Sequence, residues 1–189
     1  MLILLKSRSQ VVIKLKMDIW KATKRDVNQL ARLFKQDAEY HQRLARYYEL
    51  QQDFAWVTYT EEKLKGRNRM VCVAGSHGNL TGFIDTRIIN YPPTTRYKSI
   101  LQRICRPPKK KKLLPLKPMR WGVIEECYVN PSFRKQGIGS KLVYNTMEWF
   151  RSKQVSRIEI SVVTQNKEGE AFWQKLGFET FRLLLSKEI

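Results

Sequence analysis

Residues 129–140 combine two glycines, two cationic side chains and a helix start, a combination typical of an anion-binding loop. The segment reads V-N-P-S-F-R-K-Q-G-I-G-S, with Arg134 and Lys135 ahead of Gly137 and Gly139. Glycine lets the backbone approach a ligand closely, and the free N–H groups and positive dipole end of the following helix attract anions. The segment therefore predicts a phosphate or pyrophosphate site; a purely structural strand-to-helix turn is the alternative.

Two common nucleotide-binding motifs and a metal site are excluded. No G-x-x-x-x-G-K-[ST] sequence occurs, and the third glycine of G-x-G-x-x-G is missing after Gly139. The three cysteines, Cys72, Cys105 and Cys127, are scattered without a C-x-x-C motif or a paired histidine. Neither a zinc site nor a disulfide framework follows, and a reducing, cytoplasmic environment is expected.

Strand and helix patterns surround the loop in a regular order. Apolar residues at helical spacing predict one long or broken helix over 27–48, behind a capping box of Thr23 and Asp26. Strands are predicted at 69–74, 80–89, 122–129, 157–163 and 178–185, and further helices at 137–150 and 168–176, the last ending at Gly177. This order predicts a mixed α/β sheet packed with helices.

Two of these segments together resemble motifs of the GCN5-related N-acetyltransferase (GNAT) family. Arg134-Lys-Gln-Gly137-Ile-Gly139 is similar to the family's R/Q-x-x-G-x-G/A motif, and Asn166 with A-F-W-Q-K-L-G-F at 171–178 is similar to a second motif. Residues 22–26 fit the family's first strand and helix start. The resemblance covers about residues 17–185 outside 90–120. It implies a mostly antiparallel central sheet with one parallel, splayed strand pair and helices on both faces.

The resemblance also implies acetyl-CoA as co-substrate. Its pyrophosphate would bind backbone amides of the loop, and its pantetheine arm would pair with the exposed strand end before the loop. A backbone N–H of Cys127 or Val129 would stabilise the oxyanion that forms when an amine attacks the thioester. The residues expected to contact acetyl-CoA are Cys127, Tyr128, Val129, Arg134, Lys135, Gln136, Gly137, Ile138, Gly139, Ser140, Asn166 and Trp173.

An attacking amine must lose a proton, and Glu125 and Glu126 lie just before the cofactor-binding strand end. Strand alternation predicts that they point to opposite faces, with Glu125 on the face of Val123 and Cys127. The strand is also similar to that of the family's polyamine acetyltransferases, a resemblance that implies Glu125 as the base. Glu126 as the base, and solvation or pairing of both with the basic insert, are the alternatives.

Position 173 departs from the family pattern, in which a tyrosine protonates the leaving thiolate. Trp173 offers only an indole N–H, which is not an acid at ordinary pH. The proton for the leaving thiolate could instead come from Tyr128, Tyr144 or water, or the thiolate could leave unprotonated. Poor acetyl transfer is the remaining alternative. Trp173 and Phe172 are most simply core aromatics.

Aromatic residues of the first helix are candidates for an acceptor pocket, namely Tyr40, Tyr47 and Tyr48, with helix surface and core as the alternative. His41 lies near the apolar side of this helix. We expect it to be a satisfied core histidine rather than a catalyst.

Length and composition predict one domain with additions. The chain has 189 residues and a formal net charge of +19. Its 42% hydrophobic and 11% aromatic residues can form a sizeable core, which excludes full disorder. Residues 1–16 are expected to be an N-terminal extension, or to lengthen the first strand in part, and residues 17–189 the GNAT domain. Within it, residues 90–120 form a basic insert with six of the seven prolines. No apolar run is long enough for a membrane helix.

Two functions fit these features. The first is an N-acetyltransferase that moves an acetyl group from acetyl-CoA directly to a primary amine of a small molecule, peptide or protein. The second is a catalytically weak, acetyl-CoA-binding module that docks on nucleic acid or the ribosome through residues 96–117, where positive charge favours non-specific contact. Because few residues follow Phe178, a sheet edge completed by a second copy in a homodimer is a further expectation.

Overall fold

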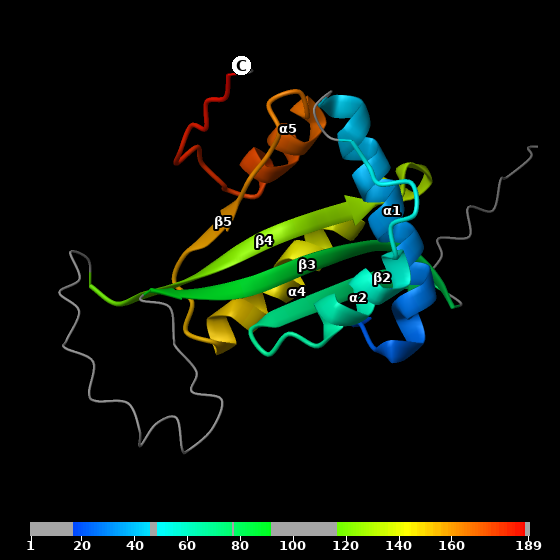
Figure 1. Ribbon diagram of the computed structural model, residues 1–189. Coiled ribbons are helices and arrows are strands. Elements are labelled where there is room, and N and C mark those ends of the chain that lie inside the picture. The colour runs from blue at the N-terminus through cyan, green and yellow to red at the C-terminus, as the bar shows by residue number, and fades with distance from the viewer. Residues whose placement is uncertain (1–16, 46–48, 77, 92–116, 188–189) are drawn as a thin grey trace, which may run out of the picture.

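The computed structural model describes residues 17–45, 49–76, 78–91 and 117–187. Its centre is a five-stranded sheet in the order β1-β2-β3-β4-β5 (Figure 1). The first three neighbouring pairs are antiparallel, and the last, β4 with β5, is parallel. The strands are β1 (Asp18–Lys21), β2 (Arg69–Ser76), β3 (Asn79–Tyr91), β4 (Met119–Val129) and β5 (Ile158–Ile160). The predicted mixed, mostly antiparallel sheet is confirmed.

Helices cover both faces of this sheet, as predicted. The helices α1 (Val27–Leu44) and α2 (Trp56–Leu64) pack on one face, and α4 (Ile138–Ser152) packs on the other (Figure 1). The helix α5 (Lys167–Lys175) follows β5, and the short 3-10 helices η1 (Lys24–Asp26) and η2 (Pro131–Phe133) precede α1 and α4.

Local signals explain where α1 begins and α5 ends. The predicted capping box is present: the Thr23 backbone N–H donates to Asp26 Oδ2 at 2.7 Å, and the Thr23 side chain accepts from the backbone of η1. At the other end of the domain, Gly177 has φ +85°, the left-handed conformation that terminates a helix at little cost for glycine.

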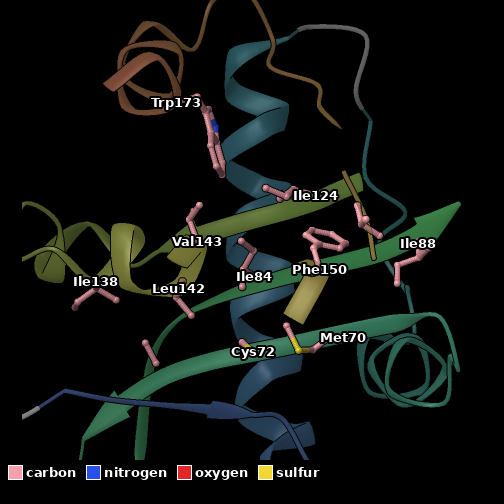
Figure 2. Close-up of a cluster of buried hydrophobic side chains, with 12 residues drawn as sticks. Met70, Cys72, Ile84, Ile88, Ile124, Ile138, Leu142, Val143, Phe150 and Trp173 are labelled. Atoms are coloured by element: carbon pink, nitrogen blue, oxygen red, sulfur yellow. The ribbon is translucent and has the colours of Figure 1, made fainter. Parts of the chain in front are cut away.

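Each face of the sheet has its own apolar core, because successive strand residues point to opposite sides. Ile84 and Ile124 lie on the α4 face, where they pack with Leu142 and Phe150 (Figure 2). The neighbouring residue Phe83 faces the other side and packs with Phe34 of α1, with 4.4 Å between ring centroids. The face of a β3 or β4 residue therefore decides which helices it meets.

The parallel pair β4–β5 is short and then opens. Only residues 122–124 of β4 pair with residues 158–160 of β5. Beyond Ile124, β4 continues to Val129 along β3, while β5 ends and leads away toward α5 (Figure 1). The predicted splayed pair is thus confirmed, and it leaves one edge of residues 125–129 without a β5 partner.

The first helical region differs from the prediction. The helix α1 ends at Leu44, and a separate helix, α2, was not predicted. Trp56, Tyr59 and Leu64 of α2 pack against the core, but Thr60 and Lys63 also turn toward the sheet and interrupt the apolar stripe on which a prediction would depend. Tyr47 and Tyr48 lie outside the described residues.

Two predicted strands near the C-terminus are corrected. The strand expected at 157–163 is limited to Ile158–Ile160, and the strand expected at 178–185 is wrong, since residues 178–187 form no strand. Phe181, Leu183, Leu184 and Leu185 are exposed instead. An apolar run gives strand propensity, but a strand also needs a backbone partner, which sequence pattern does not supply.

The strands β3 and β4 extend into the two ends of the segment predicted to be an insert. The β3–β4 ladder continues to the pair Tyr91 and Met119, so the irregular segment predicted over 90–120 is shorter at each side. Residues 92–116 and the predicted extension 1–16 lie outside the described residues.

Candidate active site

A β-bulge places both predicted catalytic glutamates on one face of the sheet. In the β3–β4 ladder, Glu126 pairs with Asp85 and Ile124 pairs with the next β3 residue, so Glu125 is an extra residue without a partner. Lys63 Nζ of α2 lies 2.7 Å from Glu126 Oε1 and 3.5 Å from Glu125 Oε2. The prediction that the two carboxylates point to opposite faces is therefore wrong, because the bulge breaks the strand alternation.

The glutamates belong to a buried ion network that the sequence did not predict. The side chain of Asp85 is fully buried, and Lys63 Nζ lies 2.6 Å from its Oδ2. Arg69 also contacts Asp85, and its second nitrogen lies 2.7 Å from Glu125 Oε2. Burial alone would lower the pKa of Lys63, but the charges of Glu126 and Asp85 outweigh burial and raise that pKa. The lysine is therefore charged and holds α2 against the sheet.

The two glutamates differ in what surrounds them. Glu125 contacts Arg69 and Arg87. Burial would raise the pKa of Glu125, but the hydrogen bond from Arg69 and the charges of Arg69, Lys63 and Arg87 outweigh burial and lower it. Glu126 instead accepts a hydrogen bond from Tyr59 Oη at 2.8 Å and lies nearer the open end of β4.

A further carboxylate, Asp37, faces the same region from α1. The residue is only 4% exposed, and His41 Nε2, one helical turn later, lies 3.6 Å from its Oδ1. Burial, the largest cause, raises the pKa of Asp37 to about 7, and Glu126 adds to this, while Arg134 and Lys63 oppose it. The His41 side chain is 37% exposed, so the expectation of a core histidine is wrong.

Both Asp37 and Asp85 were missed, although the sequence carried a signal for each. Asp37 follows Phe34 by three residues on the apolar stripe of α1, and Asp85 interrupts the apolar run of β3. A charged residue at a position that periodicity assigns to the core is a candidate functional or paired group. Periodicity cannot say which cation, if any, faces it.

The loop before α4 has the geometry of an anion site. Gly137 has φ +79° and Lys135 φ +60°, and α4 begins after Gly137 with no side chain capping its first turn. A Cβ added at Gly137 would meet no atom within 4 Å, whereas one at Gly139 would lie 3.1 Å from the Phe172 ring. The backbone is therefore open beside Gly137, and Gly139 allows α5 to pack closely on α4. Uncapped N–H groups beside open space fit a phosphate group.

Two cations flank this loop, and both are already paired. Glu168 of α5 lies 3.1 Å from Arg134 Nη1 and 2.8 Å from Lys135 Nζ. Arg134 also donates through Nε to the Val129 carbonyl at 3.0 Å and stacks over the Tyr40 ring at 5.2 Å. The loop is thereby connected to β4, to α1 and to α5.

The other predicted acetyl-CoA contacts divide between the open strand edge and the core. Cys127 and Val129 face the α4 side, and Tyr128 faces the α1 side. Asn166 caps α5 and accepts a hydrogen bond from Tyr40 Oη at 3.1 Å, which joins α1 to α5 across the open end of the sheet. Trp173 is buried (Figure 2) and packs against the partly buried rings of Phe172 and Phe178, as a core aromatic would.

Within residues 17–45, 49–76, 78–91 and 117–187, no group of three or more His, Cys, Asp or Glu side chains could hold a metal ion. None of the helices in these ranges is long and apolar enough to cross a membrane.

Comparison with known proteins identifies the family. Residues 27–178 match the model of the acetyltransferase (GNAT) family. The match covers well over half of the chain and includes the bulged strand, the loop and both flanking helices. The chain therefore belongs to the GNAT family, as its motifs indicated.

Particular relatives match over shorter stretches. An uncharacterised N-acetyltransferase of Methanocaldococcus jannaschii is 36% identical over 56 residues, or 30% of this chain and 25% of that protein. The thialysine N-epsilon-acetyltransferase of Bos taurus is 35% identical over 54 residues, or 29% of this chain and 32% of that protein. The matched segments thus span at most about a third of these relatives.

A solved structure extends the likeness to the whole fold. A mutant of the BH1408 protein of Bacillus halodurans superposes with a TM-score of 0.74 at 19% identity, covering 91% of this chain and 99% of that one. At this level of identity, the likeness shows a shared fold.

Proposed function

We propose that this chain is an N-acetyltransferase that transfers the acetyl group of acetyl-CoA directly to a primary amine. The observation that carries the proposal is the open strand edge of residues 125–129, which leads directly into the uncapped start of α4. A strand edge offers backbone partners to an extended ligand, and a helix start offers N–H groups to phosphates. Family membership over residues 27–178 supports the same function.

The residues proposed to hold the donor follow from this arrangement. The amides of residues 135–140 would bind the pyrophosphate, with Arg134 and Lys135 adding charge. Backbone groups of residues 127–129 would pair with the pantetheine arm, and Asn166 would line the gap beside it. We propose a supporting role for Trp173, since it packs with Phe172, which contacts the loop at Gly139. Acetyl-CoA supplies the activated acetyl group.

The glutamate pair is proposed to serve the acceptor. Glu126 would bind the cationic amine, because it lies near the open end of β4. Among the described residues, it forms an ion pair with Lys63 and accepts a hydrogen bond from Tyr59. Glu125, held by Arg69 and Arg87, would keep the network charged and ordered. The bovine relative is named for thialysine, a small primary amine, and thialysine is therefore one acceptor to test. We also propose that the protein acts in the cytoplasm.

Calorimetric titration with acetyl-CoA tests the donor site. We expect the wild type to bind and Gly137→Glu to lose binding by at least about 100-fold, because a carboxylate would occupy the anion site. Gly78→Glu is the matched control, since Gly78 has φ +80° with no atom within 4 Å of an added Cβ, but lies in the β2–β3 turn. It should bind acetyl-CoA like the wild type.

Release of free CoA thiol with a panel of primary amines, including thialysine and lysine, then tests transfer. A wild type that binds no acetyl-CoA, or that acetylates none of the amines, would contradict the proposal.

A further inference from the structure

Asp37 is the one deeply buried carboxylate near the glutamates that has no Lys or Arg within ion-pair distance among the described residues. Asp85 is equally buried but has Lys63 at 2.6 Å and Arg69 in contact. For Asp37, the contact that the structure gives is His41 Nε2 at 3.6 Å. Burying a carboxylate is costly unless it is paired. The fold therefore compensates the charge of Asp85 and leaves that of Asp37 largely uncompensated.

Charged and titratable groups reach Asp37 from every element packed around it. They are Glu126 and Tyr128 on β4, Lys63 on α2, Arg134 before α4, and His41 on its own helix. Two of these neighbours, Tyr128 and Arg134, belong to the proposed acetyl-CoA contacts, and Glu126 is the proposed amine partner. Asp37 thus lies where the proposed donor and acceptor sites meet.

We propose that Asp37 accepts the proton from the acceptor amine and that His41 passes it to solvent. The inference rests on the proposed function. The side chain of Asp37 is 6% exposed and that of His41 is 37% exposed, so the pair leads from the buried site to water. Glu126, held by Lys63 and Tyr59, attracts the ammonium group.

The step balances in atoms and charge. The ammonium group of the acceptor loses one proton to Asp37 Oδ, which becomes a neutral carboxyl group. The resulting amine nitrogen forms a bond to the acetyl carbon, the bond from that carbon to sulfur breaks, and the electron pair leaves with sulfur. The second nitrogen proton goes to that sulfur, directly or through water. Asp37 then returns its proton through His41 to solvent.

The electrostatics suit this role. A proton acceptor works best when its pKa lies near the operating pH, and the pKa of Asp37 is raised, chiefly by burial, to about 7. Burial lowers the pKa of His41 below 6.5, although Glu126 opposes this, so the imidazole is mainly neutral at pH 7 and can take up a proton.

The first test is acceptor-free: a ¹³C NMR titration of the aspartate carboxyl groups in the full-length protein, with Asp37→Asn to assign the Asp37 signal. We expect that signal to titrate near pH 7, and Glu126→Gln to move the midpoint lower. A midpoint near pH 4 overturns the inference, whatever the activity.

The second test is the pH profile of kcat/KM for thialysine, or for whichever amine of the panel is acetylated. We expect Asp37→Asn to lower kcat/KM at pH 7 by about 100- to 1000-fold and to remove the acidic limb near pH 7, with acetyl-CoA binding unchanged. Asp37→Glu should restore part of the rate. Glu39→Gln, on the outer side of the same helix and paired only with Lys35 among the described residues, is the matched control and should leave the profile unchanged.

The outcomes separate the inference from the function on which it rests. A wild type that acetylates no amine overturns both, even if Asp37 titrates near 7. An active wild type whose Asp37→Asn variant keeps its rate and acidic limb overturns only the role of Asp37.

Discussion

Glu125 and Glu126 are sequence neighbours on the same face of the sheet, yet they meet different groups. The extra residue in β4 turns Glu125 toward Arg69 and Arg87, which lie toward the start of β2 and the far end of β3. Glu126 remains in register with Asp85 and faces α2 and α1. One bulge thus gives the two carboxylates different partners, and this difference is the basis for proposing Glu126, not Glu125, as the acceptor contact.

This difference predicts opposite results for two conservative substitutions. Glu126→Gln should raise KM for the amine by about 10- to 100-fold, because a hydrogen bond to a charged group contributes about 1.5–3 kcal/mol. Glu125→Gln should change KM less than about 3-fold, since the proposed acceptor contact is not with this residue. Steady-state kinetics with the acetylated amine, at saturating acetyl-CoA, measures both.

The opposite pattern would have a clear meaning. If Glu125→Gln abolished turnover while leaving the acceptor KM unchanged, Glu125 would be the base that the resemblance to polyamine acetyltransferases implied. Circular dichroism of each variant would show whether loss of activity reflects loss of fold.

At the scale of elements, α5 forms ion pairs with the proposed phosphate loop. Glu168 in the first turn of α5 pairs with both Arg134 and Lys135. An anion bound at the start of α4 would compete with Glu168 for the same two cations. Pairing between α5 and the loop therefore opposes donor binding to a modest degree, since exposed ion pairs contribute about 0–1 kcal/mol.

Glu168→Gln should accordingly strengthen acetyl-CoA binding by about 2- to 5-fold at low salt. Glu170→Gln is the matched control, because Glu170 lies on the same short helix and pairs with Lys167 instead. Calorimetry at two salt concentrations measures the effect, which should shrink as salt screens the charges. Equal affinities for Glu168→Gln and the wild type at low salt would show that this pair does not compete with the ligand.

Elements whose local signals agree were predictable from the sequence. The capping box, the glycine pair at the start of α4 and the apolar runs of β2, β3 and β4 each act within a few residues. The helix α2 was missed because Thr60 and Lys63 occupy inward positions, and the strand at 178–185 was wrong because pairing is a tertiary property. The position of the motif loop between β4 and α4 was predicted. The ion network was not, since Lys63, Asp85 and Glu125 meet only in the folded sheet.

At the scale of the whole molecule, a chain of net charge +19 is built around a site in which cations are matched by carboxylates. Asp85, Glu125 and Glu126 face Lys63, Arg69 and Arg87. Asp37 is the addition that leaves the site with surplus negative charge. A buried group held away from its ordinary pKa lowers stability over part of the pH range, and functional sites commonly carry such a cost.

The pH dependence of unfolding should show this cost. The pKa of Asp37 is about 7 in the folded protein, above its ordinary 3.8, so between these values the folded state binds a proton more tightly than the unfolded state. The contribution of Asp37 is then most favourable at low pH and is lost as pH rises through about 7. Replacing Asp37 by Asn removes this loss of stability. The free energy of unfolding of the variant should therefore increase relative to that of the wild type as pH rises.

The expected size follows from linkage. Between pH 5 and pH 8, the free energy of unfolding of Asp37→Asn minus that of the wild type should rise by about 2–3 kcal/mol. Urea denaturation at several pH values measures this difference, and a constant offset from lost local contacts does not affect its slope. For Glu39→Gln, on the same helix but partly exposed, the free energy of unfolding plotted against pH should be parallel to that of the wild type. Parallel curves for Asp37→Asn would mean that Asp37 titrates as an ordinary carboxylate and is not poised to accept a proton from an amine.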